Sequence, residues 1–162
     1  MKEDLIKSLR QNHALEHATV SLLTQKLGFK ERIVGTSTFD GFYIYGNIPS
    51  EEIREAVAEA LARLQGGEHD LAISPFCGTT AVVAGALAGM ACFLALGDKD
   101  RGKRLPLAIL AATGAIIAAQ PIGRAAQKYV TTTPDLAGVS IKRITRRGTA
   151  PRTLHKIETA KD

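Results

Sequence analysis

The segment of residues 13–17 reads HALEH and brings two histidines and a glutamate together. On a helix, His13 and His17 are one turn apart, so both imidazoles project from the same face. Glu16 is three residues from His13 and lies on the same side. Two imidazoles at this spacing can hold one Zn²⁺, and a neighbouring carboxylate can accept a proton from metal-bound water. This H-x-x-E-H order predicts a zinc site with His13 and His17 as ligands and Glu16 as catalytic base.

A hydrogen-bonded His–Glu cluster without a metal is the alternative interpretation of the same segment. Burying two histidines and a glutamate costs free energy unless the side chains are paired or bind a metal. From the sequence alone, both interpretations stay open. The apolar stripe that the three polar side chains interrupt consists of Ile6, Leu9, Val20, Leu23 and Leu27. Leu15, Ala18 and Leu22 mark a second apolar face, so we expect the helix to be covered on two sides.

A zinc site with two histidines needs at least one further ligand. Glu68, in the segment GGEHD, and Cys77, next to an apolar run, are the two candidates. A cysteine thiolate is a strong zinc ligand, and packing of a small side chain is the alternative role for Cys77. We expect Cys92 to be a packing residue and His155 to be solvated.

The elements that must position these residues are indicated by periodicity and turn residues. Residues 4–27 predict one helix that ends at Gly28. Asp40-Gly41 predicts a two-residue hairpin turn between strands near 33–39 and 42–47. Ser50 predicts the N-cap of a second helix that ends at Gly66-Gly67, and residues 70–74 predict a short strand.

Two uncharged apolar runs, residues 78–97 and 105–123, follow this segment. A bilayer core needs about 20 helical residues, and the short charged connector between the runs suits a hairpin. The two runs therefore predict a pair of transmembrane helices. A helical hairpin buried inside a soluble protein is the alternative, but the rest of the chain offers little structure to cover it.

The predicted fold class is α+β, with three parts along the chain. Residues 1–77 form a soluble α-β-β-α-β domain, residues 78–123 form the membrane hairpin, and residues 124–162 form a basic tail that contains a β-hairpin. The tail has nine basic and three acidic side chains, which favours contact with a lipid surface. No recognition motif supports nucleic-acid binding. We expect an integral protein of the cytoplasmic membrane with both termini in the cytoplasm.

The motif and the order of the following elements resemble the start of pitrilysin/insulinase-type metallopeptidases. The residues that carry the resemblance are HALEH followed by strand, strand and helix. The resemblance implies that His13 and His17 bind zinc and that Glu16 is the catalytic base. That family's third ligand is a glutamate, usually further downstream than Glu68 is here, and its large chambers have no counterpart in this chain.

A resemblance over most of the chain is to an uncharacterised family of small bacterial two-span membrane proteins. It rests on NHALEHATV, DGFYIYG, GGEHDLAISPFCGT, the two apolar runs and TTTPD. In that family a histidine often occupies the position of Ser74, so Ser74 weakens a metal site here. This resemblance implies a topology and no activity.

Three functions follow as hypotheses. The first is a membrane-anchored zinc hydrolase, a peptidase that acts on a peptide or membrane protein near the bilayer. The second is a non-catalytic protein whose His/Glu cluster is a closed metal site or a buried polar network. The third is an adaptor that binds the lipid surface through the basic tail. Small residues along both apolar runs are compatible with a homo-oligomer.

Overall fold

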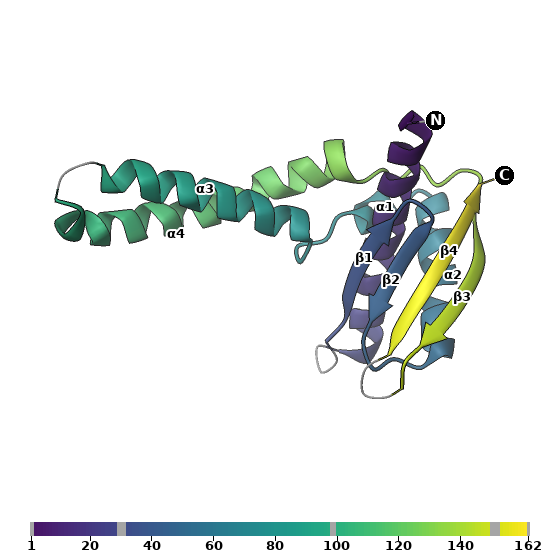
Figure 1. Cartoon of the computed structure of the whole chain (residues 1–162). Coiled ribbons are helices and arrows are strands. Elements are labelled where there is room, and N and C mark those ends of the chain that lie inside the picture. The colour runs from purple at the N-terminus through teal and green to yellow at the C-terminus, as the bar shows by residue number, and fades with distance from the viewer. Residues whose placement is uncertain (1, 29–31, 98–99, 150–152, 162) are drawn as a thin grey trace. The chain divides into compact units, whose positions relative to one another are not determined.

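The computed structural model describes all residues except 1, 29–31, 98–99, 150–152 and 162 (Figure 1). The chain forms two compact units, and each is described by itself. The first, the α/β unit, combines residues 1–74 with residues 131–162. The second, the hairpin unit, consists of residues 75–130. The chain contains both helices and a four-stranded antiparallel sheet, which confirms the mixed α+β class predicted from the sequence.

The α/β unit is a four-stranded antiparallel sheet with two helices on one of its faces (Figure 1). The strand order is β1-β2-β4-β3, so the two strands from the end of the chain complete a sheet that begins near its start. The elements are α1 (Lys2–Leu27), β1 (Val34–Thr38), β2 (Gly41–Tyr45), α2 (Ser50–Gln65), the 3-10 helix η1 (His69–Ala72), β3 (Val139–Arg147) and β4 (Leu154–Lys161).

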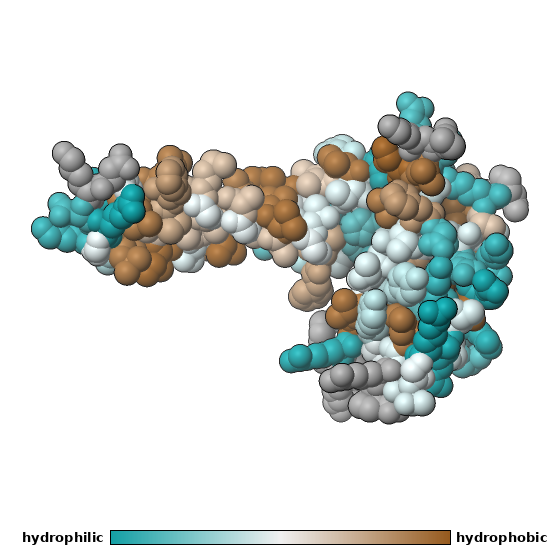
Figure 2. Space-filling view, in the orientation of Figure 1, coloured by the Kyte–Doolittle hydropathy of each residue, from teal (hydrophilic) through white to brown (hydrophobic). Residues whose placement is uncertain are grey.

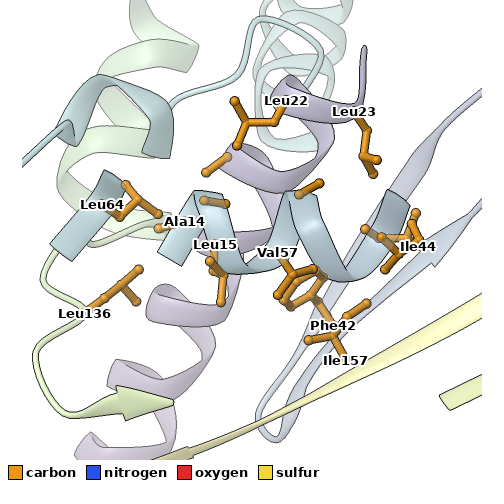
Figure 3. Close-up of a cluster of buried hydrophobic side chains, with 14 of the residues drawn as sticks. Ala14, Leu15, Leu22, Leu23, Phe42, Ile44, Val57, Leu64, Leu136 and Ile157 are labelled. Atoms are coloured by element: carbon orange, nitrogen blue, oxygen red, sulfur yellow. The ribbon is translucent and has the colours of Figure 1, made fainter. Parts of the chain in front are cut away.

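The core of the α/β unit lies between the helices and the sheet (Figure 3). Phe42 and Ile157 come from neighbouring strands and are fully buried. Fully burying one such side chain contributes about 1.5–3 kcal/mol to stability. The helices and the loop before β3 supply the opposite side of this core, which includes Leu15, Leu22, Leu23, Val57, Leu64 and Leu136.

Helix α1 is buried on two sides, as its two apolar faces predict. The predicted stripe is covered only in part, since Leu23 is fully buried whereas Ile6 is 57% exposed. On the second apolar face, Leu15 and Ala18 are fully buried and Leu22 is 7% exposed. The reason is that α1 packs against α2 on one side and β1 and β2 on another, so no single stripe describes its buried surface.

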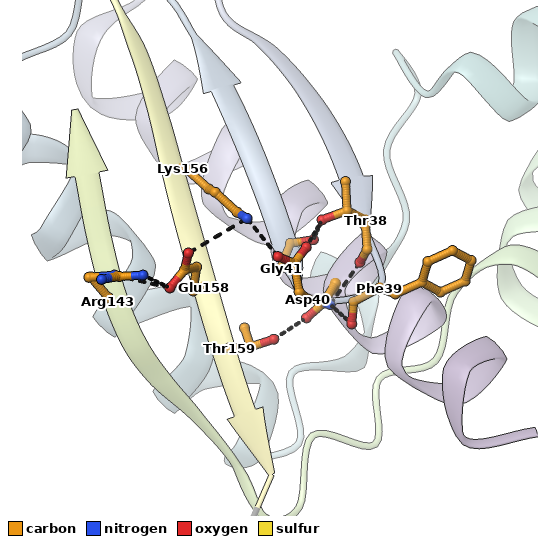
Figure 4. A network of polar contacts seen from close by, with 9 residues as sticks. Thr38, Phe39, Asp40, Gly41, Arg143, Lys156, Glu158 and Thr159 are labelled. Carbon is orange, nitrogen blue, oxygen red and sulfur yellow. Dashed lines mark hydrogen bonds and ion pairs between the residues drawn. The ribbon is translucent and has the colours of Figure 1, made fainter. Parts of the chain in front are cut away.

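The turn of the first hairpin consists of Phe39 and Asp40, because Thr38 pairs directly with Gly41. The predicted Asp40-Gly41 turn is therefore displaced by one residue. Asp40 accepts hydrogen bonds from Thr38 Oγ1 at 2.7 Å and Lys156 Nζ at 2.6 Å, so the turn is tied to β4 (Figure 4). The nearby Lys156 and Thr38 donors lower the pKa of the Asp40 carboxyl.

The last two strands correct the prediction of a separate tail over residues 124–162. Strand β4 pairs with β2 in register from Gly41↔Glu158 to Tyr45↔Leu154. The predicted β-hairpin exists as β3 and β4, but it belongs to the sheet of the α/β unit. Residues 70–74 are not a strand, since His69–Ala72 form the 3-10 helix η1.

The start of α2 also differs from the prediction. Pro49 is the N-cap residue, and Ser50 is already the first helical residue. The Ser50 hydroxyl does not cap the helix but lies 3.0 Å from Nε2 of His155 on β4. His155 is fully buried rather than solvated, because β4 lies inside the sheet.

The hairpin unit contains α3 (Gly78–Leu96) and α4 (Arg101–Ala126), followed by the π-helical turn η2 (Gln127–Thr131). By length and composition, the helical segments 78–96 and 101–131 are long and apolar enough to cross a membrane. The helices meet at Gly123, where a Cβ would lie 2.6 Å from the Thr80 hydroxyl oxygen. Gln127 Nε2 donates to that oxygen at 2.9 Å. Apolar side chains cover the outside of the pair (Figure 2).

Replacing Gly41 by alanine is expected to destabilise the α/β unit by roughly 2 kcal/mol or more. Gly41 has φ +147°, and an added Cβ would lie 1.9 Å from the carbonyl oxygen of Ile157, which is backbone that cannot rotate away. The free energy of unfolding from denaturant titration measures the effect. Gly67→Ala is the matched control, because Gly67 also has positive φ but no atom within 4 Å of the added Cβ.

Acidification below about pH 6.5 is expected to destabilise the α/β unit through His155. Burial, with a smaller contribution from Arg146, lowers the pKa of the folded imidazole. The unfolded chain then binds a proton that the folded chain does not, so stability falls as the pH drops below the unfolded pKa. Thermal unfolding between pH 8 and pH 5 tests this. His155→Leu should flatten the profile in this window, whereas a replacement of exposed His69 that flattens it equally would contradict the assignment.

Candidate metal centre

The middle of α1 holds the chain segment that returns from the hairpin unit to the sheet. Arg10 donates from Nε and Nη2 to the carbonyl oxygen of Thr132, at 3.2 and 2.9 Å. Gln11 Nε2 donates to the carbonyl oxygen of Asp135 at 2.7 Å. The backbone N–H of Thr133 donates to the carbonyl oxygen of Arg10 at 3.2 Å. These bonds fix the polar side of α1 against residues 131–135.

His13 and His17 lie side by side on this part of α1, as their spacing predicts. Their ring centroids are 4.3 Å apart, with the ring planes inclined at 59°. Nδ1 of His13 is 2.9 Å from the carbonyl oxygen of Thr131, and Nδ1 of His17 is 2.8 Å from that of Ala72. The histidines therefore contact the end of the first chain segment of the α/β unit and the start of its second.

These two bonds determine the tautomer of each neutral imidazole. A carbonyl oxygen only accepts hydrogen bonds, so Nδ1 must carry the proton in both rings. The lone pair of each ring then belongs to Nε2, which is the atom that can coordinate a metal. A backbone carbonyl on the other ring nitrogen is the usual way in which a metal-binding histidine is oriented.

Glu16 faces strand β1. Its Oε2 accepts a hydrogen bond from the Ser37 hydroxyl at 2.9 Å. Its Oε1 lies against Gly35, where an added Cβ would be only 1.9 Å away. The absence of a side chain at Gly35 thus leaves the space that the carboxylate occupies. Glu16 as a whole residue is 7% exposed.

Asn12 is a structurally important residue that the H-x-x-E-H motif does not include. Its Nδ2 donates to the carbonyl oxygens of Thr38 and Phe39, at 2.9 and 3.2 Å. Its Oδ1 accepts from Thr159 Oγ1 at 2.8 Å, so one buried amide joins α1 to β1 and β4. Asn12 directly precedes His13 in the sequence, and no motif singles it out for this role.

Glu68 is engaged elsewhere on the surface. Its Oε2 accepts from Arg63 Nη2 at 2.6 Å and from Nε at 2.9 Å. The guanidinium lowers the pKa of this exposed carboxyl. Within the described residues of the α/β unit, no third His, Cys, Asp or Glu side chain completes a metal-binding group with His13 and His17.

Cys77 belongs to the hairpin unit, where it is the N-cap residue of α3. Its sulfur accepts a hydrogen bond from the backbone N–H of Thr79 at 3.4 Å. Cys92 lies within α3, in the uncharged run.

Comparison with known proteins places this arrangement in a family without assigning it an activity. Residues 8–144 match the family model described as "Domain of unknown function (DUF6391)". An uncharacterised protein of Picosynechococcus sp. is 37% identical over 139 residues, which cover 76% of this chain and 65% of the relative. The chain thus spans just under two thirds of that relative's length.

No solved structure matches the chain. The resemblance to an uncharacterised family is borne out at the level of the family, while the likeness to pitrilysin-type peptidases stays a prediction. The match covers both histidines, Glu16, Cys77 and the two apolar helices, and it extends into β3. On this evidence, the chain belongs to the DUF6391 family.

Proposed function

We propose that the protein is a membrane-anchored metal-binding protein whose zinc ion is held by Nε2 of His13 and His17. The observation that carries the proposal is the pair of Nδ1–carbonyl hydrogen bonds at 2.9 and 2.8 Å. They orient two adjacent rings and leave the lone pair on Nε2 in each. Holding the ligands in place beforehand reduces the conformational entropy that metal binding would otherwise cost.

Cys77 is the third ligand in this proposal. It follows Ser74, the last residue of the first segment of the α/β unit, by three positions, and Ala72 of that segment already contacts His17. A short stretch of chain therefore suffices to deliver the thiolate. Glu68 fits less well, because zinc would have to displace the guanidinium of Arg63 from its carboxylate. Two imidazoles and a thiolate are a favourable donor set for Zn²⁺.

The placement of Glu16 supports the non-catalytic form of this proposal over a zinc hydrolase. A catalytic base must reach the proton of a metal-bound water. Here one carboxylate oxygen accepts from Ser37 and the other lies against Gly35, so the group is oriented toward β1. The same contacts explain a buried carboxylate on α1 without invoking catalysis.

The anchoring part of the proposal rests on the hairpin unit. Its described outer surface carries large apolar side chains that would be unfavourable in water, such as Val82 at 72% and Phe93 at 77% exposure. At the base of the hairpin, Phe76 and Tyr129 are exposed, and Lys128 accompanies them. Aromatic and basic side chains are typical of the membrane–water interface.

The first test is metal content. The protein purified in detergent with supplied zinc is expected to contain about one zinc per chain by elemental analysis. His13→Ala/His17→Ala should lose it, because two of the three donors are removed. His69→Ala is the matched control, since His69 is exposed on η1 and should leave the zinc in place. A folded wild-type protein that binds no zinc after reconstitution would refute the proposal.

The role of Glu16 is tested separately by Glu16→Gln, which keeps the size and the capacity to accept from Ser37. For a non-catalytic site we expect the zinc content to be unchanged in Glu16→Gln. We also expect no peptide hydrolysis by either the wild type or the variant. Peptide hydrolysis by the zinc-loaded wild type that falls 10²-fold or more in Glu16→Gln would establish the hydrolase instead. Glu16→Gln that loses zinc would make Glu16 a ligand.

A further inference from the structure

One lateral face of α4 carries two polar side chains seven residues apart, and we propose that this face pairs with α4 of a second copy of the chain. The inference rests on the membrane anchoring proposed above and adds a partner to it. The face is defined by Ile109, Thr113, Ile116 and Gln120, and we call it the Gln120 face.

The Gln120 face has the spacing of a helix-pairing seam. Steps of four, three and four residues separate its members, which is the repeat that brings two helices together at a small left-handed crossing angle. Ile109 is 57% exposed and Ile116 is 46% exposed. Thr113 and Gln120 are exposed as well. Helix α3 packs on another side of α4, where Ala108, Ala119 and Gly123 are buried.

The side-chain amide of Gln120 is the polar group of this face that needs a hydrogen-bond partner. Thr113 satisfies its hydroxyl by donating to the carbonyl oxygen of Ile109 at 2.9 Å. In the part of the chain that the structure describes, no group hydrogen-bonds the Gln120 side chain. An amide that faces hydrocarbon without a partner is costly, and glutamine amides in membrane helices pair across helix interfaces.

Pro121 adds a second polar requirement at the same level of α4. It lies inside the helix and has no N–H, so the carbonyl oxygen of Ile117 lacks its usual helical donor. Freed carbonyls in membrane helices are satisfied by groups of neighbouring helices. A Gln120 amide from an adjacent helix offers two N–H donors, which suit the side-chain oxygen of Gln120 and the freed carbonyl oxygen of Ile117.

A second copy of the chain is the partner that this chemistry fits. An amide both donates and accepts, so it is complementary to an identical amide. With both copies inserted in the same orientation, a two-fold axis along the membrane normal places equal positions of α4 opposite each other. Gln120 then meets Gln120 of the second copy at the same depth, as polar residues do at equivalent seam positions of parallel helix pairs.

The test measures self-association of the full chain in phosphatidylcholine/phosphatidylglycerol vesicles, by energy transfer between donor- and acceptor-labelled protein at several protein-to-lipid ratios. Gln120→Leu is expected to weaken dimerisation about 3- to 20-fold, the range for one hydrogen bond between membrane helices. Ile122→Ala is the control, because position 122 lies about 200° around the helix from position 120 and should leave dimerisation unchanged.

Cysteine cross-linking locates the interface. In a Cys92→Ala background, Gln120→Cys should form an intermolecular disulfide on oxidation, and Ile122→Cys should not. A wild-type protein that floats with the vesicles but stays monomeric overturns this inference alone, as does a dimer that Gln120→Leu leaves intact or that cross-links through position 122. A protein that does not float with the vesicles overturns both this inference and the membrane anchoring.

Discussion

The fold of the α/β unit depends on hydrogen bonds from α1 to the two places where the chain of the unit is interrupted. These places lie near Ala72 and Thr131. The sheet is complete only when β3 and β4 return beside β2, and 56 residues lie between Ser74 and Thr131. Backbone carbonyls at both points need donors once they are covered. His17 supplies one for Ala72, and His13 and Arg10 supply those for Thr131 and Thr132. One polar stretch of α1 therefore closes the unit around its insertion.

This structural role and a metal role use different atoms of the same side chains. Nδ1 of each histidine is committed to a carbonyl, whereas coordination would use Nε2. The two roles reinforce each other, since a ring held by the backbone is also a ring aimed at a fixed point. A metal bound there would in turn stabilise the closure of the unit, because binding to the folded state alone shifts the folding equilibrium.

Local features were predictable from the sequence, and contacts between distant segments were not. The helix over residues 4–27, the first hairpin and the two apolar helices follow from periodicity and turn residues. The pairing of β2 with β4 spans more than 100 residues and has no local signal, so the sequence alone predicts a separate tail. For the same reason, the sequence placed Glu16 beside the histidines but did not reveal Ser37 and Gly35, which orient it toward β1.

Several polar side chains in both units reach partners on other elements, and this makes the Gln120 face informative. In the α/β unit, Asn12 and His155 find partners on other elements, and in the hairpin unit Gln127 binds Thr80 across the helix pair. Oε1 of Gln11 and Nδ1 of His155 have no hydrogen-bond partner among the described residues, so each of these side chains is held through its other polar atom. Under the proposed membrane anchoring, the exposed Gln120 amide of α4 would be half of a contact whose other half is supplied by another helix.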